Sequence, residues 1–269
     1  MLVTLLFLAL TTSSRNVAVG YEALSTATAY NENTAVGYRA LKASTDGYSN
    51  TAVGVNSLLA NTTGHSNVAV GHAAGTANTT GVQSTIVGSF AGDALTEGND
   101  NIALGHDALS GDTKGSRSVA IGSNTLKTQN FTSATNANNT AVGNFAGEAI
   151  TTGTGNTFIG LSAGDSTTDG VNNVAIGINA LGGADADHSN VAVGQLALNV
   201  CTGNSNTAVG DQAGTNVTSG VNNVFLGEDA GRSGSPGGQI TTASNTLVLG
   251  NGSIANAHIQ VDWTVASDE

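Results

Sequence analysis

Two groups of acidic residues are the positions in this chain best suited to hold a metal ion. Asp211 and Glu228 occupy the same place in two neighbouring copies of a repeated phrase, each directly after a glycine. Carboxylates one strand spacing apart repel each other unless water or a cation lies between them, and Ca²⁺ favours oxygen ligands. Asp185 and Asp187, with Asp169 one coil earlier, form a second acidic group. For both groups the alternatives are a calcium site and a solvated turn.

The histidines and the cysteine predict no site. His72 and His106 share one column of the repeat but lie two copies apart, roughly 9.6 Å at strand spacing, too far to ligate one ion. Cys201 is the only cysteine, and a lone cysteine usually fills a small apolar space. The sequence contains no P-loop, HExxH or GxSxG motif and no EF-hand loop. We therefore expect a protein that is not an enzyme.

Three tyrosines, Tyr21, Tyr38 and Tyr48, lie in the first copies of the repeat. Aromatic rings in a row could offer a surface on which sugars stack. The alternative is that the rings pack on neighbouring copies of the repeat.

A repeat of about 17 residues positions all of these side chains. Its core is a five-residue phrase such as NTAVG, residues 33–37. Asn or Ser usually stands four residues before the glycine, Ala usually two before, and Val, Ile or Leu always one before. Ala usually follows three residues after it, and Leu or Gly four after. A period near 20 residues is typical of solenoids. The phrase closes at Gly20, Gly37, Gly54, Gly71, Gly88, Gly105, Gly122, Gly143, Gly160, Gly177, Gly194, Gly210, Gly227 and Gly250.

This repeat predicts an all-β fold, a parallel β-roll or β-solenoid of about fourteen coils. β-Branched residues favour extended chain, so each phrase should form a short strand, and a second short strand should run through the Ala and Leu/Gly positions. Coils roughly 4.8 Å apart make a rod of roughly 65 Å, along which asparagines in register can form ladders. We assign residues 1–15 to an N-terminal apolar cap or strand, 16–250 to the β-roll and 251–269 to a C-terminal junction. Two insertions, 128–138 and 231–244, should bulge from the rod.

A second period predicts which large residues fill the coil interior. Glycine replaces leucine four residues after the phrase in pairs of neighbouring coils. In the second coil of each pair, the alanine of the phrase becomes Ile86, Phe158 or Phe225. Close packing requires a large residue where leucine is missing, so the alanine and leucine columns should face each other inside the coil.

The residue before each glycine should then point out of the coil, because alternate residues of a strand face opposite sides. This column is always aliphatic, and so long an exposed stripe is unusual on a soluble monomer. We expect it to meet the stripes of sister chains around a symmetry axis. This aliphatic stripe consists of Val19, Val36, Val53, Val70, Val87, Leu104, Ile121, Val142, Ile159, Ile176, Val193, Val209 and Leu226.

The phrases also resemble those of a known family. NVAVGYEAL (16–24), SVAIGSNTL (118–126) and NVAIGINAL (173–181) resemble the head repeats of trimeric autotransporter adhesins. The longer 17-residue unit is more similar to repeats of bacteriophage tail fibres. The resemblance covers about residues 16–250, and it implies a left-handed parallel β-roll that forms homotrimers through the strand of the phrase.

The C-terminal residues carry a second resemblance. Residues 245–269 resemble the junction that precedes the intramolecular chaperone domain of phage tail spikes and fibres, which commonly opens with Ser-Asp-Glu-Arg. Ser267, Asp268 and Glu269 match the first three of these residues. The resemblance implies a self-cleavage point near Ser267. We assign Ser267 no catalytic role, because the catalytic partner that such a domain supplies does not follow here.

Together these features predict a non-enzymatic structural and adhesive rod of a phage tail fibre, a virion protein that contributes to host attachment. The head of a bacterial trimeric autotransporter adhesin, on the cell surface, is the first alternative, and a monomeric surface- or ice-binding solenoid is the second. The expected partners are further copies of the chain and a host-cell glycan or protein. Residues 128–138 and 231–244 are the segments that we expect to contact a receptor.

Charge and composition narrow the remaining classes. The chain has a net charge of −12, and its 7 Lys and Arg are scattered from Arg15 to Arg232. Nucleic-acid binding is therefore disfavoured, because such a chain would neutralise few phosphates. The first ten residues are apolar but too few to cross a bilayer, so we expect no membrane insertion. No cofactor is expected, apart from Ca²⁺ at Asp211 and Glu228.

Overall fold

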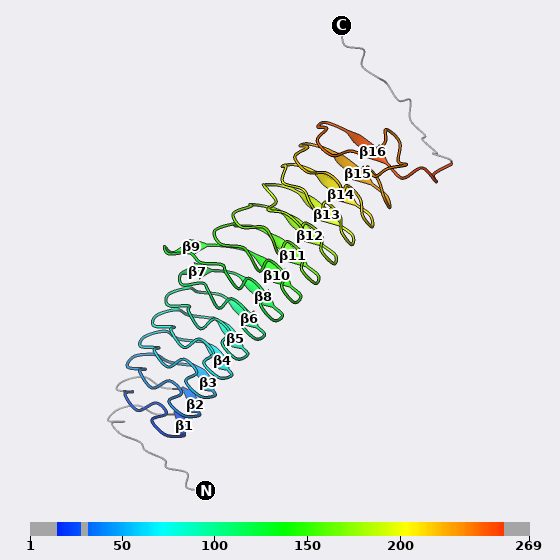
Figure 1. Ribbon diagram of the computed structural model, residues 1–269. Coiled ribbons are helices and arrows are strands. Elements are labelled where there is room, and N and C mark those ends of the chain that lie inside the picture. The colour runs from blue at the N-terminus through cyan, green and yellow to red at the C-terminus, as the bar shows by residue number, and fades with distance from the viewer. Residues whose placement is uncertain (1–14, 28–31, 256–269) are drawn as a thin grey trace.

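The computed structural model is a rod of stacked coils (Figure 1), and it describes residues 15–27 and 32–255. The predicted all-β parallel solenoid is confirmed, because fourteen three-residue strands form one parallel sheet along the rod. The N-terminal cap expected at 1–15 lies outside the described residues except for Arg15, and so do Ser267 and most of the C-terminal junction. The strands are β1 (Val17–Val19), β2 (Thr34–Val36), β3 (Thr51–Val53), β4 (Val68–Val70), β5 (Thr85–Val87), β6 (Ile102–Leu104), β8 (Val119–Ile121), β10 (Thr140–Val142), β11 (Thr157–Ile159), β12 (Val174–Ile176), β13 (Val191–Val193), β14 (Thr207–Val209), β15 (Val224–Leu226) and β16 (Leu247–Leu249).

The strands pair in a register that keeps every column of the repeat aligned. Ala35 lies beside Ala18 on one side and beside Ala52 on the other. The same columns stay aligned across both insertions, where Ala120 pairs with Ala141 and Phe225 pairs with Val248. Each insertion is therefore accommodated outside the sheet, and the stripe and the interior continue past it.

The second side of each coil differs from the expected strand. The residues after the glycine form successive turns, as where Ala40 N donates to Gly37 O (3.5 Å) and Lys42 N donates to Arg39 O (3.3 Å). Positive φ angles at Arg39 (57°) and Leu41 (50°) alternate with ordinary ones, so the chain cannot extend into a strand. Coils still bond to each other here, since Leu41 N donates to Ser57 O at 3.0 Å.

The glycine that closes each phrase is required by its backbone. Gly37 has a φ of 139°, in a region that side chains rarely adopt, and an added Cβ would collide with the carbonyl group of Gly54 in the next coil. The close approach repeats from coil to coil, which explains why this column never changes.

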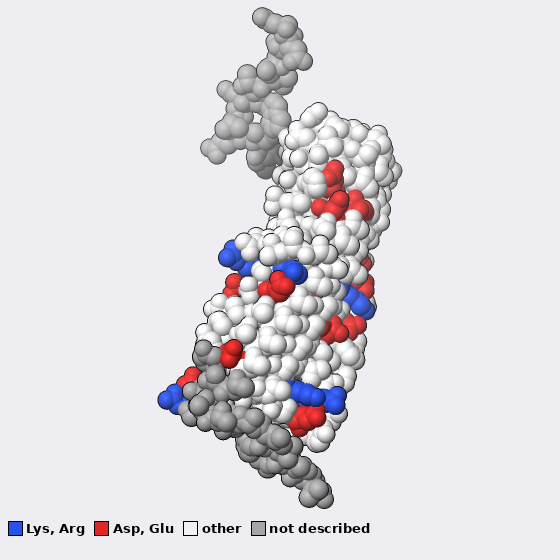
Figure 2. Space-filling view, turned by 90° about the vertical axis from the view of Figure 1, so that its left-hand side faces the viewer, with Lys and Arg blue, Asp and Glu red and all other residues white. Residues whose placement is uncertain are grey.

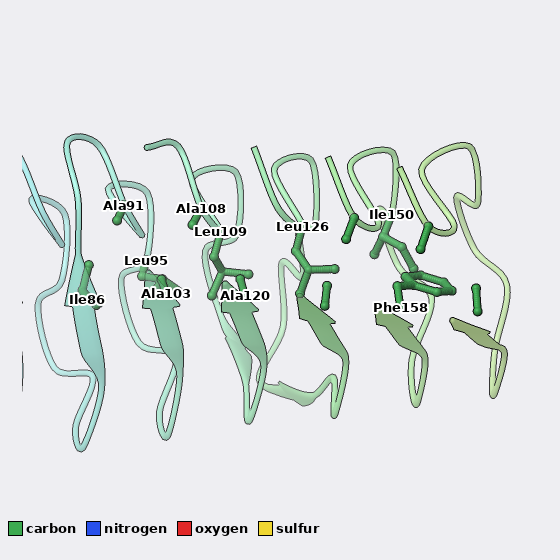
Figure 3. Packing of buried hydrophobic residues seen from close by; sticks show 14 of the residues in the cluster. Ile86, Ala91, Leu95, Ala103, Ala108, Leu109, Ala120, Leu126, Ile150 and Phe158 are labelled. Atoms are coloured by element: carbon green, nitrogen blue, oxygen red, sulfur yellow. The ribbon is translucent and has the colours of Figure 1, made fainter. Parts of the chain in front are cut away.

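The coil interior lies between the strand and the turns. The middle residue of every strand is buried, as is the leucine four residues after the glycine. Figure 3 shows Leu109 and Leu126 reaching from the turns towards Ala103 and Ala120 on the strands. The interior is narrow because small alanines face single leucines, which accounts for the low aromatic content of 4%.

Large residues replace alanine only where two glycines make room. Phe158 is fully buried, and a Cβ added to Gly147 would lie 2.9 Å from its Cδ2, while one added to Gly164 would lie 2.5 Å from its Cε1. Ile86 and Phe225 are also fully buried and lie against equivalent glycine pairs. The three predicted fillers therefore occupy the space that the missing leucines leave.

The insertion at 128–138 folds back onto the rod over most of its length. Its Thr135–Asn136 (β9) pairs with Gly115–Ser116 (β7) to form a small parallel sheet at the edge of the rod away from the main row of strands (Figure 1). Phe131 is buried, and the only run of exposed residues is 132–134. Most of the insertion at 231–244 is exposed, and Ser235 Oγ holds its first turn by accepting a hydrogen bond from Gly231 N at 3.1 Å.

Candidate assembly and binding surfaces

The aliphatic stripe follows the outer face of the main sheet. Seven of its members are 36–41% exposed: Val19, Val70, Val87, Ile159, Ile176, Val209 and Leu226. Within the stripe, Val36, Val53, Leu104, Ile121, Val142 and Val193 are half-buried by their neighbours along the rod. The strands are thus buried on their inner face only, and an apolar surface runs the length of the sheet.

Two neighbouring columns widen this surface, and the sequence-based stripe did not include them. The first residue of each strand in the main sheet also points outwards and is Val, Thr, Ile or Leu, with Val17 and Leu247 about half exposed. The alternation that identified the stripe predicts this column too. In the column directly after the glycine, Val55 is 40%, Leu161 is 47% and Ile178 is 45% exposed, so the apolar surface is broad at these three coils.

No charged residue stands in either outward column of the fourteen strands. Charged residues do stand on both sides of the strands, for example Arg15 and Glu32 before them and Glu22 and Arg39 after them. On the face drawn in Figure 2, basic side chains mostly lie beside acidic ones, and much of the surface carries no charge. The two outward columns of the strands therefore carry no charge over their whole length, whereas the column directly after the glycine carries Asp211 and Glu228 near the C-terminal end of the rod.

A buried ladder of asparagines supports the strands from behind. Asn50 N donates to Asn33 Oδ1 at 2.9 Å, and Asn50 Nδ2 donates to Gly64 O at 2.8 Å. Asn67 repeats the first bond with Asn50 Oδ1, at 3.0 Å. Each of these asparagine side chains thus satisfies one buried donor and one buried acceptor of the backbone, which fixes the strand and the preceding turn of the coils that carry asparagine in this column.

The ladder is interrupted at Ser118, and a buried glutamine takes over. Gln129 Nε2 donates to Ser118 Oγ at 3.0 Å and to Asp112 Oδ2 at 2.6 Å, and Gln129 Oε1 accepts from Asn139 Nδ2 at 2.8 Å. Asp112 Oδ1 accepts from the backbone N–H groups of Gly115 (2.9 Å) and Phe131 (3.1 Å). The 128–138 insertion therefore supplies polar atoms that the serine cannot provide.

The acidic groups lie where the sequence placed them. Asp229 N donates to Asp211 O at 2.9 Å, so the column of Asp211 and Glu228 runs through adjacent coils. Asp185 caps the coil before it, accepting from Thr168 N (2.7 Å) and Thr168 Oγ1 (2.6 Å). Among the described residues, no three His, Cys, Asp or Glu side chains come together as a metal site would need. Calcium at Asp211 and Glu228 therefore stays a prediction.

The histidines and the cysteine have structural surroundings. Phe90 stands between His72 and His106, edge-on to both, with ring centroids 5.0 and 6.2 Å away. Cys201 is fully buried and accepts from Asn206 Nδ2 at 3.4 Å. Burial raises the pKa of the Cys201 thiol to about 11, so little thiolate is present at neutral pH.

The tyrosines stack on the rod itself. Tyr21 and Tyr38 lie face to face with their centroids 5.5 Å apart, and Tyr48 stacks on His65 at 4.5 Å. Arg39 lies over the ring of Tyr38, 4.9 Å from its centroid. Ring faces that contact neighbouring coils are not free to stack on sugars, so packing between coils is the arrangement that the geometry favours.

Comparison with known proteins assigns no family: no family model matches the chain, and no curated protein matches it significantly. Within the part of the chain that the structure describes, no helix is long and apolar enough to cross a membrane.

Proposed function

We propose that this chain is a non-enzymatic structural and adhesive rod of a phage tail fibre, which assembles as a homotrimer and contributes to host-cell attachment. The observation that carries the proposal is the half-exposed aliphatic stripe, which crosses thirteen successive strands without a charge. An apolar surface of this length on a soluble rod calls for a partner. A copy of the same chain has the same coil spacing and can match it coil by coil.

The rod is suited to a mechanical role. Each coil bonds to the next through the sheet, the turns and the buried asparagines, so that bending would break hydrogen bonds in all three places. The resemblance of the phrases to phage tail-fibre repeats supports the same role. Under this proposal three rods pack through their stripes and leave the turn sides of the coils facing outwards.

The exposed insertions are the segments that we assign to receptor contact. Residues 132–134 and most of 231–244 project from the otherwise regular coils. They belong to the turn regions, so a trimer through the sheets would leave them accessible. A host-cell glycan or protein is the class of receptor that a virion fibre would bind.

Cell binding tests the attachment role. The purified, fluorescently labelled chain is incubated with a panel of bacterial strains, and bound fluorescence is compared with that of two variants. One variant replaces 132–134 with Gly-Ser-Gly, and the other shortens 231–244 to the length of a regular coil. We expect saturable binding to some strains and a loss of at least about tenfold in one loop variant, as for removal of a binding hot spot.

Four outcomes would count against the proposed function. Binding to no strain in a broad panel argues against attachment, and release of sugar fragments from a host polysaccharide argues for an enzyme. A single-chain mass together with adsorption to ice or a mineral surface would favour the monomeric solenoid. Binding to animal cells instead of bacteria would favour the bacterial adhesin.

A further inference from the structure

The charged residues on the two sides of the stripe form two short ladders in the first two coils. On the side before the strands, Arg15 and Glu32 pair, with Nη1 and Oε1 2.6 Å apart. On the side after the strands, Glu22 Oε2 accepts from Arg39 Nε at 2.9 Å and from Lys42 Nζ at 2.7 Å. Along the rod, the first ladder reads positive then negative, and the second reads negative then positive.

These ladders lie at the borders of the stripe. Arg15 and Glu32 each stand two residues before the first outward residue of a strand, β1 or β2, and both are well exposed. Arg39 lies over Tyr38, the residue that directly follows the closing glycine. Hydrogen bonding from Lys42, with Arg39 beside it, lowers the pKa of the Glu22 carboxyl, which keeps that group charged.

Symmetry decides which ladder of one chain meets which ladder of the next. When rods face each other around an axis parallel to their length, the side before the strands of one chain meets the side after the strands of its neighbour, at the same height. We call these the leading side and the trailing side. Arg15 would then face Glu22 of the next copy, and Glu32 would face Arg39. Opposite charges meet in both coils.

Other arrangements of the same stripe lose this match. A slip of one coil in either direction would place Glu32 against Glu22 or Arg15 against Arg39, which are like charges. In an antiparallel pair, the leading sides meet each other in reverse order, so Arg15 and Glu32 would face the uncharged Asn245 and Asn222. Only the parallel, in-register arrangement brings both residues of the first ladder, Arg15 and Glu32, against an opposite charge of the second ladder.

Farther along the rod, the borders carry little that opposes this register. At the sixth coil, Asp100 would face Asp107 of the next copy, which is one like-charge contact against the two opposite-charge contacts of the first two coils; Lys127, 3.1 Å from Asp107, lies beside it. At the seventh coil, Arg117 would face the uncharged Ser123 and Asn124. The stripe itself is almost uniform from coil to coil, so apolar contact alone would tolerate slippage.

We propose that Arg15, Glu32, Glu22 and Arg39 set the register of self-association, so that the partner of the stripe is a second copy of this chain, parallel and with the same coils at the same height. The inference rests on the proposed assembly through the stripe. The stripe supplies the contact, and the two ladders select one alignment among many that would bury similar apolar area.

Charge reversal of one ladder at a time tests this inference while the pairs within each chain are kept. One variant carries Arg15→Glu with Glu32→Arg, and a second carries Glu22→Lys with Arg39→Glu and Lys42→Glu. A third carries all five substitutions. Circular dichroism checks that each variant folds, and sedimentation equilibrium at low salt measures the chain concentration at half assembly.

We expect each single reversal to raise that concentration by at least about tenfold, because like charges then meet in both coils of every interface. The variant with all five substitutions should return to within about threefold of the original chain, and salt near 1 M should reduce the differences, because it screens exposed charges.

Three outcomes would overturn the inference. If the original chain assembles and the single reversals assemble equally well, the ladders do not set the register, although assembly through the stripe stands. If the variant with all five substitutions assembles as weakly as the variants with one reversed ladder, the residues act within one chain. If the original chain stays monomeric at all concentrations, the proposed assembly fails and this inference fails with it.

Discussion

Replacing Phe158 with alanine should open a cavity in the coil interior that the structure cannot close. The ring is fully buried and lies against the backbone of Gly147 and Gly164, which have no side chains to move into the space. Truncation of a buried phenylalanine to alanine lowers the free energy of unfolding by about 3–5 kcal/mol, and we expect a value in the upper part of this range. For a chain of this size, that corresponds to a fall in melting temperature on the order of 10 °C.

The same geometry predicts how the loss can be repaired. Gly147 and Gly164 have φ angles of 60° and 61°, and Leu41 and Leu58 adopt 50° and 48° at the equivalent places of other coils. A variant with Phe158→Ala, Gly147→Leu and Gly164→Leu would therefore carry the alanine and leucine pattern of ordinary coils. We expect it to recover most of the lost stability, whereas Gly147→Leu alone should destabilise because its Cβ meets the ring.

Thermal melting at one fixed chain concentration measures all four proteins, because association makes the midpoint depend on concentration. The reasoning is refuted if Phe158→Ala costs less than about 1 kcal/mol, or if the triple variant melts no higher than Phe158→Ala. Either result would mean that the glycine pairs and the large residues are not complementary parts of one packing arrangement.

Three further predictions concern single side chains. Asn156→Ala should cost about 2–5 kcal/mol, because it leaves a buried backbone donor and a buried acceptor without partners, and Asn156→Ser should cost less in the same denaturation series. Burial raises the pKa of the Asp165 carboxyl, so the folded chain binds this proton more tightly than the unfolded chain. The fold therefore becomes less stable as pH rises and the carboxyl loses its proton. Asp165→Asn should therefore raise the melting temperature at pH 7 and lose this advantage at acid pH, and an unchanged midpoint at pH 7 would argue against it. Cys201 should react with a thiol reagent only after unfolding, and rapid labelling of the native chain would contradict its burial.

The columns of the repeat could be predicted from the sequence because one physical constraint determines the residue type in each. Close backbone contact between coils requires the closing glycine, the narrow interior requires the alanine, and buried backbone groups require the asparagine. Phe158 and its glycine pair were predictable for the same reason, since a large residue and a missing leucine change together. These features are local and repeat many times, so the sequence itself contains the comparison that identifies them.

Other features could not be predicted because they depend on choices that the residue types leave open. Leu41 adopts a positive φ, which leucine rarely does. The residue type at that position therefore does not predict that the chain forms turns and not a second strand. The role of Gln129 was equally hidden, because a glutamine in an insertion gives no sign that it will reach Ser118 in the interior. The stacking of Tyr21 on Tyr38 follows from rotamers that the sequence does not specify.

Whether the stripe is an interface is the central question, and the mass of the chain in solution tests it most directly. Light scattering over a range of concentrations should give about 79 kDa, three times the 26.4 kDa of one chain. Ile159→Asp with Ile176→Asp should lower the mass towards that of one chain, whereas Ile254→Asp, an exposed isoleucine off the stripe, should leave it unchanged. A mass of one chain at every concentration, or a trimer that the two stripe substitutions leave intact, would contradict the account.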